Sequence, residues 1–138
     1  MKGARLSRGN STLVGVGGAA LALLIAFILT LLSEDKAVLV LAVFTGILSG
    51  VYFGVAVSPT RARNTVMNIA VAVVFAALAL LGAWASPMFF ALALFGHAAW
   101  DVVIDHPRAL NEPIAPWYMP LCIGADIVLG VFVVIRFY

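Results

Sequence analysis

The sequence predicts an all-α integral membrane protein, a single domain over residues 1–138 folded as a bundle of five transmembrane helices. The hydrophobic fraction is 64% and only 10% of the residues are charged, whereas soluble domains contain roughly 25% charged residues. Mean hydropathy is +1.16, and the apolar residues fall into long runs separated by short polar turns. Such a chain cannot cover a globular surface with polar side chains, so we expect the lipid bilayer to be its main partner.

Five apolar segments predict the five helices. Crossing ~30 Å of hydrocarbon requires ~20 residues of helix, and only the fourth segment falls short of that length. Turns with proline at Ser58-Pro59 and Ser86-Pro87 separate the helices, and the loop 105–116 is too rich in proline to be helical. The predicted spans are 13–32, 37–57, 66–85, 88–104 and 117–135.

The first helix is expected to remain in the protein. A signal peptide also begins with basic residues, but its apolar core has only about 7–15 residues and ends in a cleavage site. The polar residues 33–36 (SEDK) offer no such site after the longer run 13–32. Cys122 is the only cysteine, so no disulfide can form within the chain.

Basic residues predict the orientation. With five spans, the N-terminus, the turn 58–65 and the loop 105–116 lie on one side of the membrane. Lysine and arginine gather on the cytoplasmic side, and that side holds most of them: Lys2, Arg5, Arg8, Arg61, Arg63 and Arg108, against Lys36 and Arg136. We expect a cytoplasmic N-terminus in a multi-pass protein of the cell membrane, a prokaryotic inner membrane in particular. A net charge of +2 is too small to indicate a nucleic-acid surface.

Small residues form two patterns in the first two helices. Residues 15–20 (GVGGAA) match a dinucleotide-binding pattern, but they lie within a membrane span rather than between a strand and a helix. We interpret them as a site of close helix packing. In the second helix, Gly46, Gly50 and Gly54 form two overlapping GxxxG steps, which predict a close helix–helix seam and a candidate interface for a homo-oligomer.

The second helix also carries Thr45, Ser49 and Tyr52 on one face, away from its glycines. These hydroxyl groups can line a polar site between helices. Alternatively, Thr45 and Ser49 can bond back to carbonyl groups of their own helix, which carries no function.

The segment 95–108 (FGHAAWDVVIDHPR) concentrates ionisable groups in an otherwise apolar chain. His97, Asp101 and Asp105 recur four residues apart with Trp100 among them, so they lie on one side of the fourth helix. Measured from Asp105 at ~1.5 Å per residue, Asp101 lies ~6 Å deep and His97 ~12 Å deep.

Polar groups of two other helices lie at the same depths. Asp126 at ~13 Å and Ser49 at ~12 Å match His97, and Cys122 and Tyr52, both at ~7 Å, match Asp101. A charged group at the bilayer centre costs at least about 2.5–3.5 kcal/mol. We therefore expect His97, Asp101 and Asp126 to face inward and to approach within ~4 Å. They would form a pocket in the cytoplasmic half, lined by Ser49 or Tyr52 and open toward the loop after the fourth helix.

A purely structural role is an alternative for each group. His97 and Asp101 can be a hydrogen-bonded pair that clamps helices together. The residues 105–107 can simply end the fourth helix at the membrane interface. Trp100 can pack against lipid or the core, and Cys122 can be an inert buried thiol.

A pattern in the last third of the chain resembles a group of small uncharacterised prokaryotic multi-pass membrane proteins. It comprises H-x-x-W-D at 97–101, D-H-P-R at 105–108, P-W-Y-x-P-x-C at 116–122 and then Asp126. In that group the helix usually ends in a His-His pair, whereas here the first member is Asp105, which weakens a metal site carried over from it. The resemblance implies the fold but no activity. Separately, a His and an acid four residues apart in a membrane helix are similar to the emopamil-binding type of sterol isomerase.

The first function that fits is an enzyme acting on a lipid or isoprenoid. His97, Asp101 and Asp126 would be its catalytic acids and bases, with Trp100, Tyr52 and Ser49 contacting the lipid-like substrate. The second is a divalent metal site for catalysis or transport. His97, Asp101 and Asp126, with His106 as a further candidate ligand, form a nitrogen and oxygen set that suits Zn, Mn or Fe.

Two further functions remain open. A proton or ion path would use the intramembrane acids and histidine, although no polar residue of the last two helices leads on to Glu34 and Asp35 at the opposite side. A structural or partner-binding subunit would depend on the small-residue seams alone. We rank an enzyme slightly ahead of a proton- or metal-ion transporter or binding protein.

Overall fold

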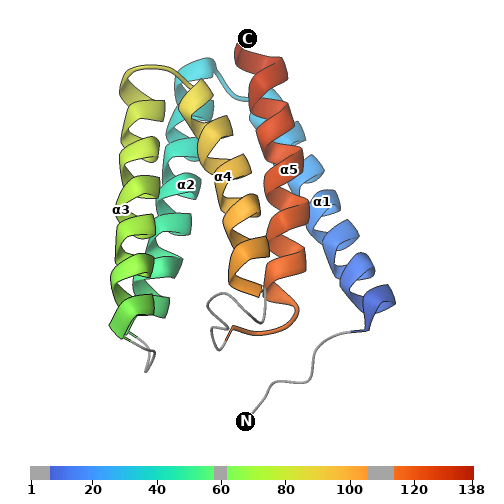
Figure 1. The fold of residues 1–138 in the computed structure, drawn as a ribbon. Coiled ribbons are helices and arrows are strands. Elements are labelled where there is room, and N and C mark those ends of the chain that lie inside the picture. The colour runs from blue at the N-terminus through green and yellow to red at the C-terminus, as the bar shows by residue number, and fades with distance from the viewer. Residues whose placement is uncertain (1–6, 58–61, 106–113) are drawn as a thin grey trace.

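The computed structural model is a bundle of five helices in which successive helices run antiparallel (Figure 1). It describes residues 7–57, 62–105 and 114–138. The first helix begins at the lower end of the bundle, and the last helix ends at the upper end (Figure 1). The helices are α1 (Arg8–Thr30), α2 (Glu34–Val57), α3 (Ala62–Trp84), α4 (Met88–Asp105) and α5 (Tyr118–Phe137).

The length and composition of the helices fit a multi-pass membrane protein. Four of them are long and apolar enough to cross a membrane, and α4 contributes a shorter apolar stretch, Met88–Ile104. Large apolar side chains such as Leu23, Val43 and Ile135 are exposed on the outside of the bundle, where a soluble protein would place polar groups. The prediction of an all-α helical bundle is confirmed, whereas the cytoplasmic N-terminus stays a prediction.

Helices α1 and α3 begin several residues before the predicted spans. At α1, the Ser7 side chain accepts a hydrogen bond from the Asn10 backbone N–H at 3.3 Å, which satisfies one of the free donors at the start of a helix. The helix therefore starts at Arg8, within the basic segment, and not at the first apolar residue.

Two apolar clusters fill the interior, one above the other. The upper cluster joins α1, α2, α4 and α5 and includes Leu29, Leu41, Phe90, Leu94, Leu129 and Val133. The lower cluster joins α2, α3, α4 and α5 and consists of Tyr52, Ala72, Phe75, Ala93, Ile104 and Met119. The polar side chains discussed below lie beside the lower cluster.

Glycines bring α1 and α5 into backbone contact. A Cβ atom added to Gly18 would overlap the backbone of Leu121, and one added to Gly124 would overlap the carbonyl of Gly15. The interpretation of residues 15–20 as a close packing site is confirmed. At the upper end, Arg136 Nη2 donates a hydrogen bond to the Leu32 carbonyl at 3.1 Å, which ties the end of α5 to the α1–α2 connection.

The predicted seam along Gly46, Gly50 and Gly54 is wrong within the chain. A Cβ atom added to any of these glycines would meet no heavy atom within 4 Å in the described structure, and all three residues are exposed. Helix α2 instead packs on α3 through its polar face. The GxxxG pattern permits a close approach but does not determine which face of a helix packs, and in α2 the buried face is the one that carries Thr45, Ser49 and Tyr52. An oligomer interface on the glycine face stays a prediction.

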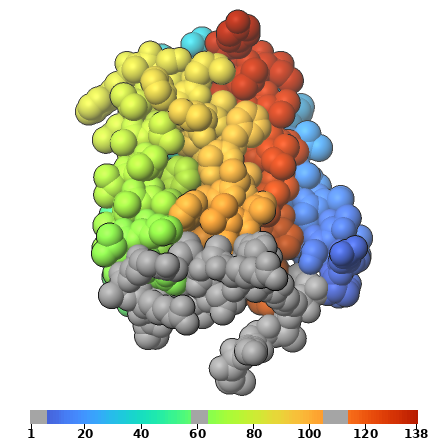
Figure 2. All heavy atoms as spheres, in the orientation of Figure 1, coloured from blue at the N-terminus to red at the C-terminus, as the bar shows by residue number. Residues whose placement is uncertain are grey.

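Helix α4 lies in the middle of the bundle, between α3 and α5 (Figure 2). It packs mainly on α5 and also contacts α3 and α2. Side chains on several faces of α4 therefore become buried, and this places His97 and Asp101 where three other helices surround them.

Candidate functional site

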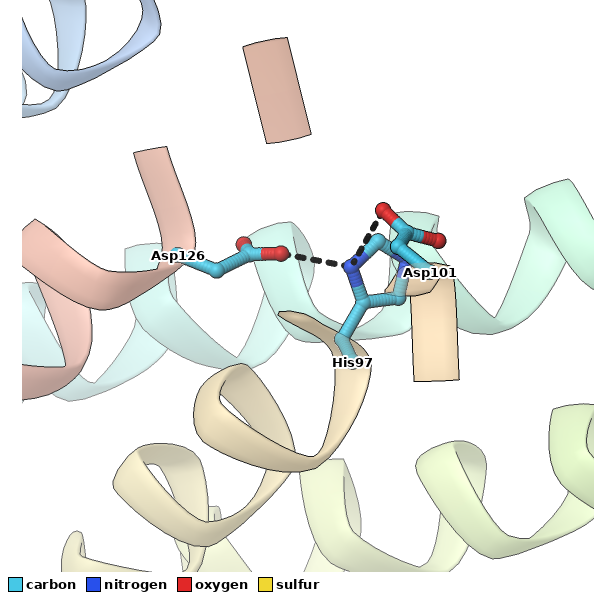
Figure 3. Close-up of side chains that lie close together, drawn as sticks. All are labelled: His97, Asp101 and Asp126. Atoms are coloured by element: carbon cyan, nitrogen blue, oxygen red, sulfur yellow. Dashed lines mark hydrogen bonds and ion pairs between the residues drawn. The ribbon is translucent and has the colours of Figure 1, made fainter. Parts of the chain in front are cut away.

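Three ionisable side chains meet in the interior of the bundle. His97 and Asp101 lie one turn apart on α4, and Asp126 faces them from α5 (Figure 3). His97 and Asp101 are 0% exposed and Asp126 is 1% exposed. The prediction that these groups face inward and approach one another is confirmed.

The contact between His97 and Asp126 is a short hydrogen bond that joins α4 to α5. His97 Nδ1 lies 2.5 Å from Asp126 Oδ2. An ionised carboxylate can only accept hydrogen bonds, so with ionised Asp126 the imidazole donates through Nδ1–H. This tautomer leaves Nε2 as the acceptor nitrogen. Nε2 is buried and has no hydrogen-bond partner in the described part of the chain.

A second carboxylate faces the same imidazole nitrogen. Asp101 Oδ2 lies 3.7 Å from His97 Nδ1, and the other oxygen, Oδ1, accepts a hydrogen bond from the Tyr52 hydroxyl at 2.6 Å. Asp101 Oδ2 is buried and accepts no hydrogen bond from any described residue. Asp126, His97, Asp101 and Tyr52 thus form a polar chain across α5, α4 and α2, which we call the His–Asp cluster.

Two aromatic rings hold the imidazole from the side. The His97 ring meets the ring of Tyr52 at 5.3 Å and 62°, and the ring of Phe75 at 5.6 Å and 64°. Both are edge-on contacts of the kind that aromatic pairs prefer. Phe75 was not among the predicted site residues. The chain has 9 phenylalanines, and nothing in the sequence distinguishes Phe75 from the others.

Ser49 is buried but does not join the cluster. Its hydroxyl donates to the Ala72 carbonyl on α3 at 2.7 Å, so it bonds neither to the cluster nor to its own helix. Thr45 is also buried, and its hydroxyl has no partner among the described residues. The predicted hydroxyl face of α2 exists, but only Tyr52 reaches the His–Asp cluster.

The other predicted site residues differ in their placement. Trp100 is half-buried against the lower apolar cluster, and its Nε1–H is buried with no partner in the described structure. Cys122 is a half-buried free thiol. His106, the further metal ligand that we predicted, lies outside the described residues, and α4 ends one residue before it at Asp105.

The predicted pocket would open toward the loop after α4, which lies outside the described residues, so its opening stays a prediction. The three ionisable side chains are closed off from solvent, because the lower apolar cluster packs directly around them. Access by a substrate or an ion from water therefore requires a movement of the helices or side chains.

Polar groups approach the cluster from one end of the bundle. The other buried polar side chains of the described residues are Thr45, Ser49, Asn64 and Asn68, which lie between the middle of α2 and the first turns of α3. Thr45 lies highest of these four, on α2 between Leu41 and Leu48 of the upper apolar cluster. The described interior is therefore polar from the lower end to about mid-height and apolar above.

The cluster has the donor atoms of a metal site. His97, Asp101 and Asp126 each offer one ligand atom, and these atoms lie within 4.8 Å of one another. As it stands, the short His97–Asp126 contact is that of a hydrogen bond. The same three residues can therefore serve acid–base chemistry or, after a small rearrangement, the binding of a cation.

Comparison with known proteins gives no match: no family model, curated protein or solved structure is significantly similar to this chain.

Proposed function

We propose that the protein binds a cation, either a proton or a metal ion, at the His–Asp cluster inside a multi-pass membrane bundle, as ion transporters and ion-binding membrane proteins do. The observation that carries this proposal is the approach of two carboxylates from different helices to one buried imidazole nitrogen, at 2.5 and 3.7 Å. Ionisable residues at membrane depth are expensive and typically mark paths for protons, ions or substrates.

The charge of the His–Asp cluster gives a physical reason for cation binding. With both carboxylates ionised and the imidazole neutral, the cluster carries two negative charges, and no described cation lies beside it to balance them. A buried ion whose charge is unbalanced costs several kcal/mol, so the cluster must hold positive charge from outside. Protons or a metal ion can supply this charge.

The distribution of polar groups supports access from one side. Buried polar residues lead from the lower end of the bundle to the cluster, and the upper core is apolar. A static pore is not supported by this arrangement. Transport would require the cluster to open alternately to the two sides, by a shift of α4 against its neighbours.

The proposal is tested by reconstituting the purified protein into liposomes that contain a proton-sensitive or a metal-sensitive dye. We expect the wild type to carry protons or a divalent metal across the membrane, and Asp126→Asn and His97→Gln to lose that flux. Asp35→Asn is the matched control, because Asp35 is an exposed acid in the first turn of α2. Flux that is absent in the wild type, or unchanged in both cluster variants, would contradict transport.

An acid–base enzyme acting on a lipid or isoprenoid is the second candidate. The observation that favours it is the His97 imidazole, which is bound through Nδ1 to Asp126 and has an unpartnered Nε2. Catalytic His–Asp pairs use this arrangement, in which the carboxylate fixes the tautomer and Nε2 accepts the proton. An enzyme predicts that the lipids of cells producing the wild type, compared with His97→Gln by mass spectrometry, differ in a substrate–product pair. Identical lipid profiles would argue against it.

A further inference from the structure

We propose that the cation is a divalent transition-metal ion bound by His97 Nδ1, Asp101 Oδ2 and Asp126 Oδ2. This inference rests on the proposed function, which it makes specific. The three residues are at most 1% exposed, and their ligand atoms lie within 4.8 Å of one another, which a small rearrangement would reduce to the spacing around a single ion.

The donor set determines the class of ion. One imidazole nitrogen and two carboxylate oxygens suit Zn, Mn or Fe(II). Calcium takes 6–8 oxygen ligands, and magnesium usually keeps several waters, for which the closed and apolar surroundings give no room. Three protein ligands leave one position open in a four-coordinate site, as in sites that exchange a ligand. Two ionised carboxylates also balance the charge of one divalent ion.

The distances require only a small adjustment. Ligands that lie ~2.0–2.1 Å from a tetrahedral ion are about 3.3 Å apart. The distance from His97 Nδ1 to Asp101 Oδ2 is already close to this, at 3.7 Å. The distance from Nδ1 to Asp126 Oδ2 is 2.5 Å and must lengthen by about 1 Å. The Asp126 side chain must move back by this amount. Nδ1 must also lose the proton that it donates to Asp126, which can pass to Nε2, because an imidazole nitrogen binds a metal ion only when it is deprotonated.

Tyr52 prepares Asp101 for this role. Its hydroxyl holds Oδ1 at 2.6 Å, and this leaves Oδ2 directed toward the imidazole nitrogen without a hydrogen bond from the described residues. A buried carboxylate oxygen without a partner is unusual, because it forfeits the hydrogen bonds that it had in water. A bound ion would satisfy this oxygen. Tyr52 would then orient a ligand without binding the metal itself, as groups behind metal ligands commonly do.

The experiment loads purified protein in detergent with Co²⁺ or Zn²⁺, removes free metal and measures bound metal by mass spectrometry. We expect about one ion per chain and, with Co²⁺, visible absorption bands of a four-coordinate nitrogen and oxygen site. His97→Gln and Asp126→Asn should lose the metal and the bands. Tyr52→Phe should retain the ligands but bind about 10–100-fold more weakly. Asp35→Asn should bind like the wild type.

Thermal unfolding in metal-free buffer identifies variants that have lost the fold, and Tyr52→Phe keeps the test informative because it removes no ligand. Absence of metal from the wild type, before and after loading, would overturn the metal inference. Metal that persists in folded His97→Gln and Asp126→Asn would overturn the assigned site. If metal is absent but proton flux in liposomes still depends on His97 and Asp126, the proposed function stands and only this inference fails.

Discussion

Two side-chain hydrogen bonds join helices near the His–Asp cluster, and they differ in whether the acceptor would keep another hydrogen bond if the donor were removed. Tyr52 donates to a carboxylate oxygen of Asp101, and Ser49 donates to the Ala72 carbonyl. That carbonyl lies within α3, where it also accepts from the helix backbone. Asp101 Oδ1 is a side-chain oxygen and takes no part in such a backbone hydrogen bond. Removing each hydroxyl in turn therefore compares a hydrogen bond within the cluster with one outside it, by its effect on stability.

We expect Tyr52→Phe to destabilise the protein more than Ser49→Ala. Tyr52→Phe leaves a buried carboxylate oxygen unsatisfied, which costs about 1–3 kcal/mol. Ser49→Ala removes one hydrogen bond between membrane helices, worth about 0.6 kcal/mol on average. Reversible unfolding of both variants in mixed detergent measures the difference. Equal losses would mean that the Tyr52–Asp101 bond has no special role.

At the scale of residues, counting depth along the helices predicted the right partners. The levels assigned from the sequence paired His97 with Asp126 and Asp101 with Tyr52, and both contacts occur. Depth contains no information on helix rotation, so Ser49 was also expected at the cluster, although it faces α3. The contact of Phe75 could not be predicted, because a packing aromatic has no signature in an apolar helix.

Among the helices, α1 and α5 come into backbone contact at Gly15, Gly18 and Gly124. Gly18 and Gly124 tolerate no side chain, because a Cβ atom at either position would overlap the backbone of the other helix. Backbone cannot move aside as the end of a side chain can. Helix α5 carries Asp126 and is also the main packing partner of α4. The α1–α5 contact therefore supports the helix that faces His97.

Gly124→Ala and Gly50→Ala should have opposite effects on stability. Alanine is favoured over glycine in a helix by about 1 kcal/mol, and Gly50 has open space for a methyl group. At Gly124 the same methyl group would overlap the Gly15 carbonyl and push α1 from α5. We expect a lower unfolding midpoint for Gly124→Ala and an unchanged or higher one for Gly50→Ala. A Gly124→Ala variant as stable as Gly50→Ala would contradict the close contact.

The helices themselves were largely predictable, and their pairings were only partly so. Each apolar run became a helix, because its length and composition left no other structure that satisfies the backbone in lipid. The glycines of 15–20 indicated a close contact but not its partner. The stronger pattern at Gly46, Gly50 and Gly54 indicated a seam that the described chain does not form.

For the whole molecule, the arrangement of five antiparallel helices places the start of α1 and the end of α5 at opposite ends of the bundle (Figure 1). At 1.5 Å per residue, α4 is about 27 Å long, slightly less than the ~30 Å of a typical hydrocarbon core. Its lower end carries the ionisable residues. If the orientation predicted from the basic residues holds, the polar half of the interior faces the cytoplasm.

Reporter fusions test this orientation. Fusions after Arg63 and Glu112 should be cytoplasmic, and fusions after Lys36, Ser86 and Tyr138 should be external, because most lysine and arginine residues lie in the first set of connections. A cytoplasmic C-terminus would require an even number of crossings. It would also contradict the passage of α4 through the membrane, on which the depth of His97 depends.

The central claim is that His97 and Asp126 are joined in the interior of the bundle, and nuclear magnetic resonance of the histidine side chains tests it most directly. The chain has 2 histidines, so ¹⁵N-histidine labelling of a His106→Gln variant, purified free of metal ions, gives the signals of His97 alone. We predict a proton on Nδ1 that exchanges slowly with water and is strongly deshielded by the short hydrogen bond. This signal should disappear in Asp126→Ala and persist in Asp35→Asn. A His97 ring that carries its proton on Nε2, or exchanges rapidly with water in the folded protein, would contradict the buried His–Asp cluster.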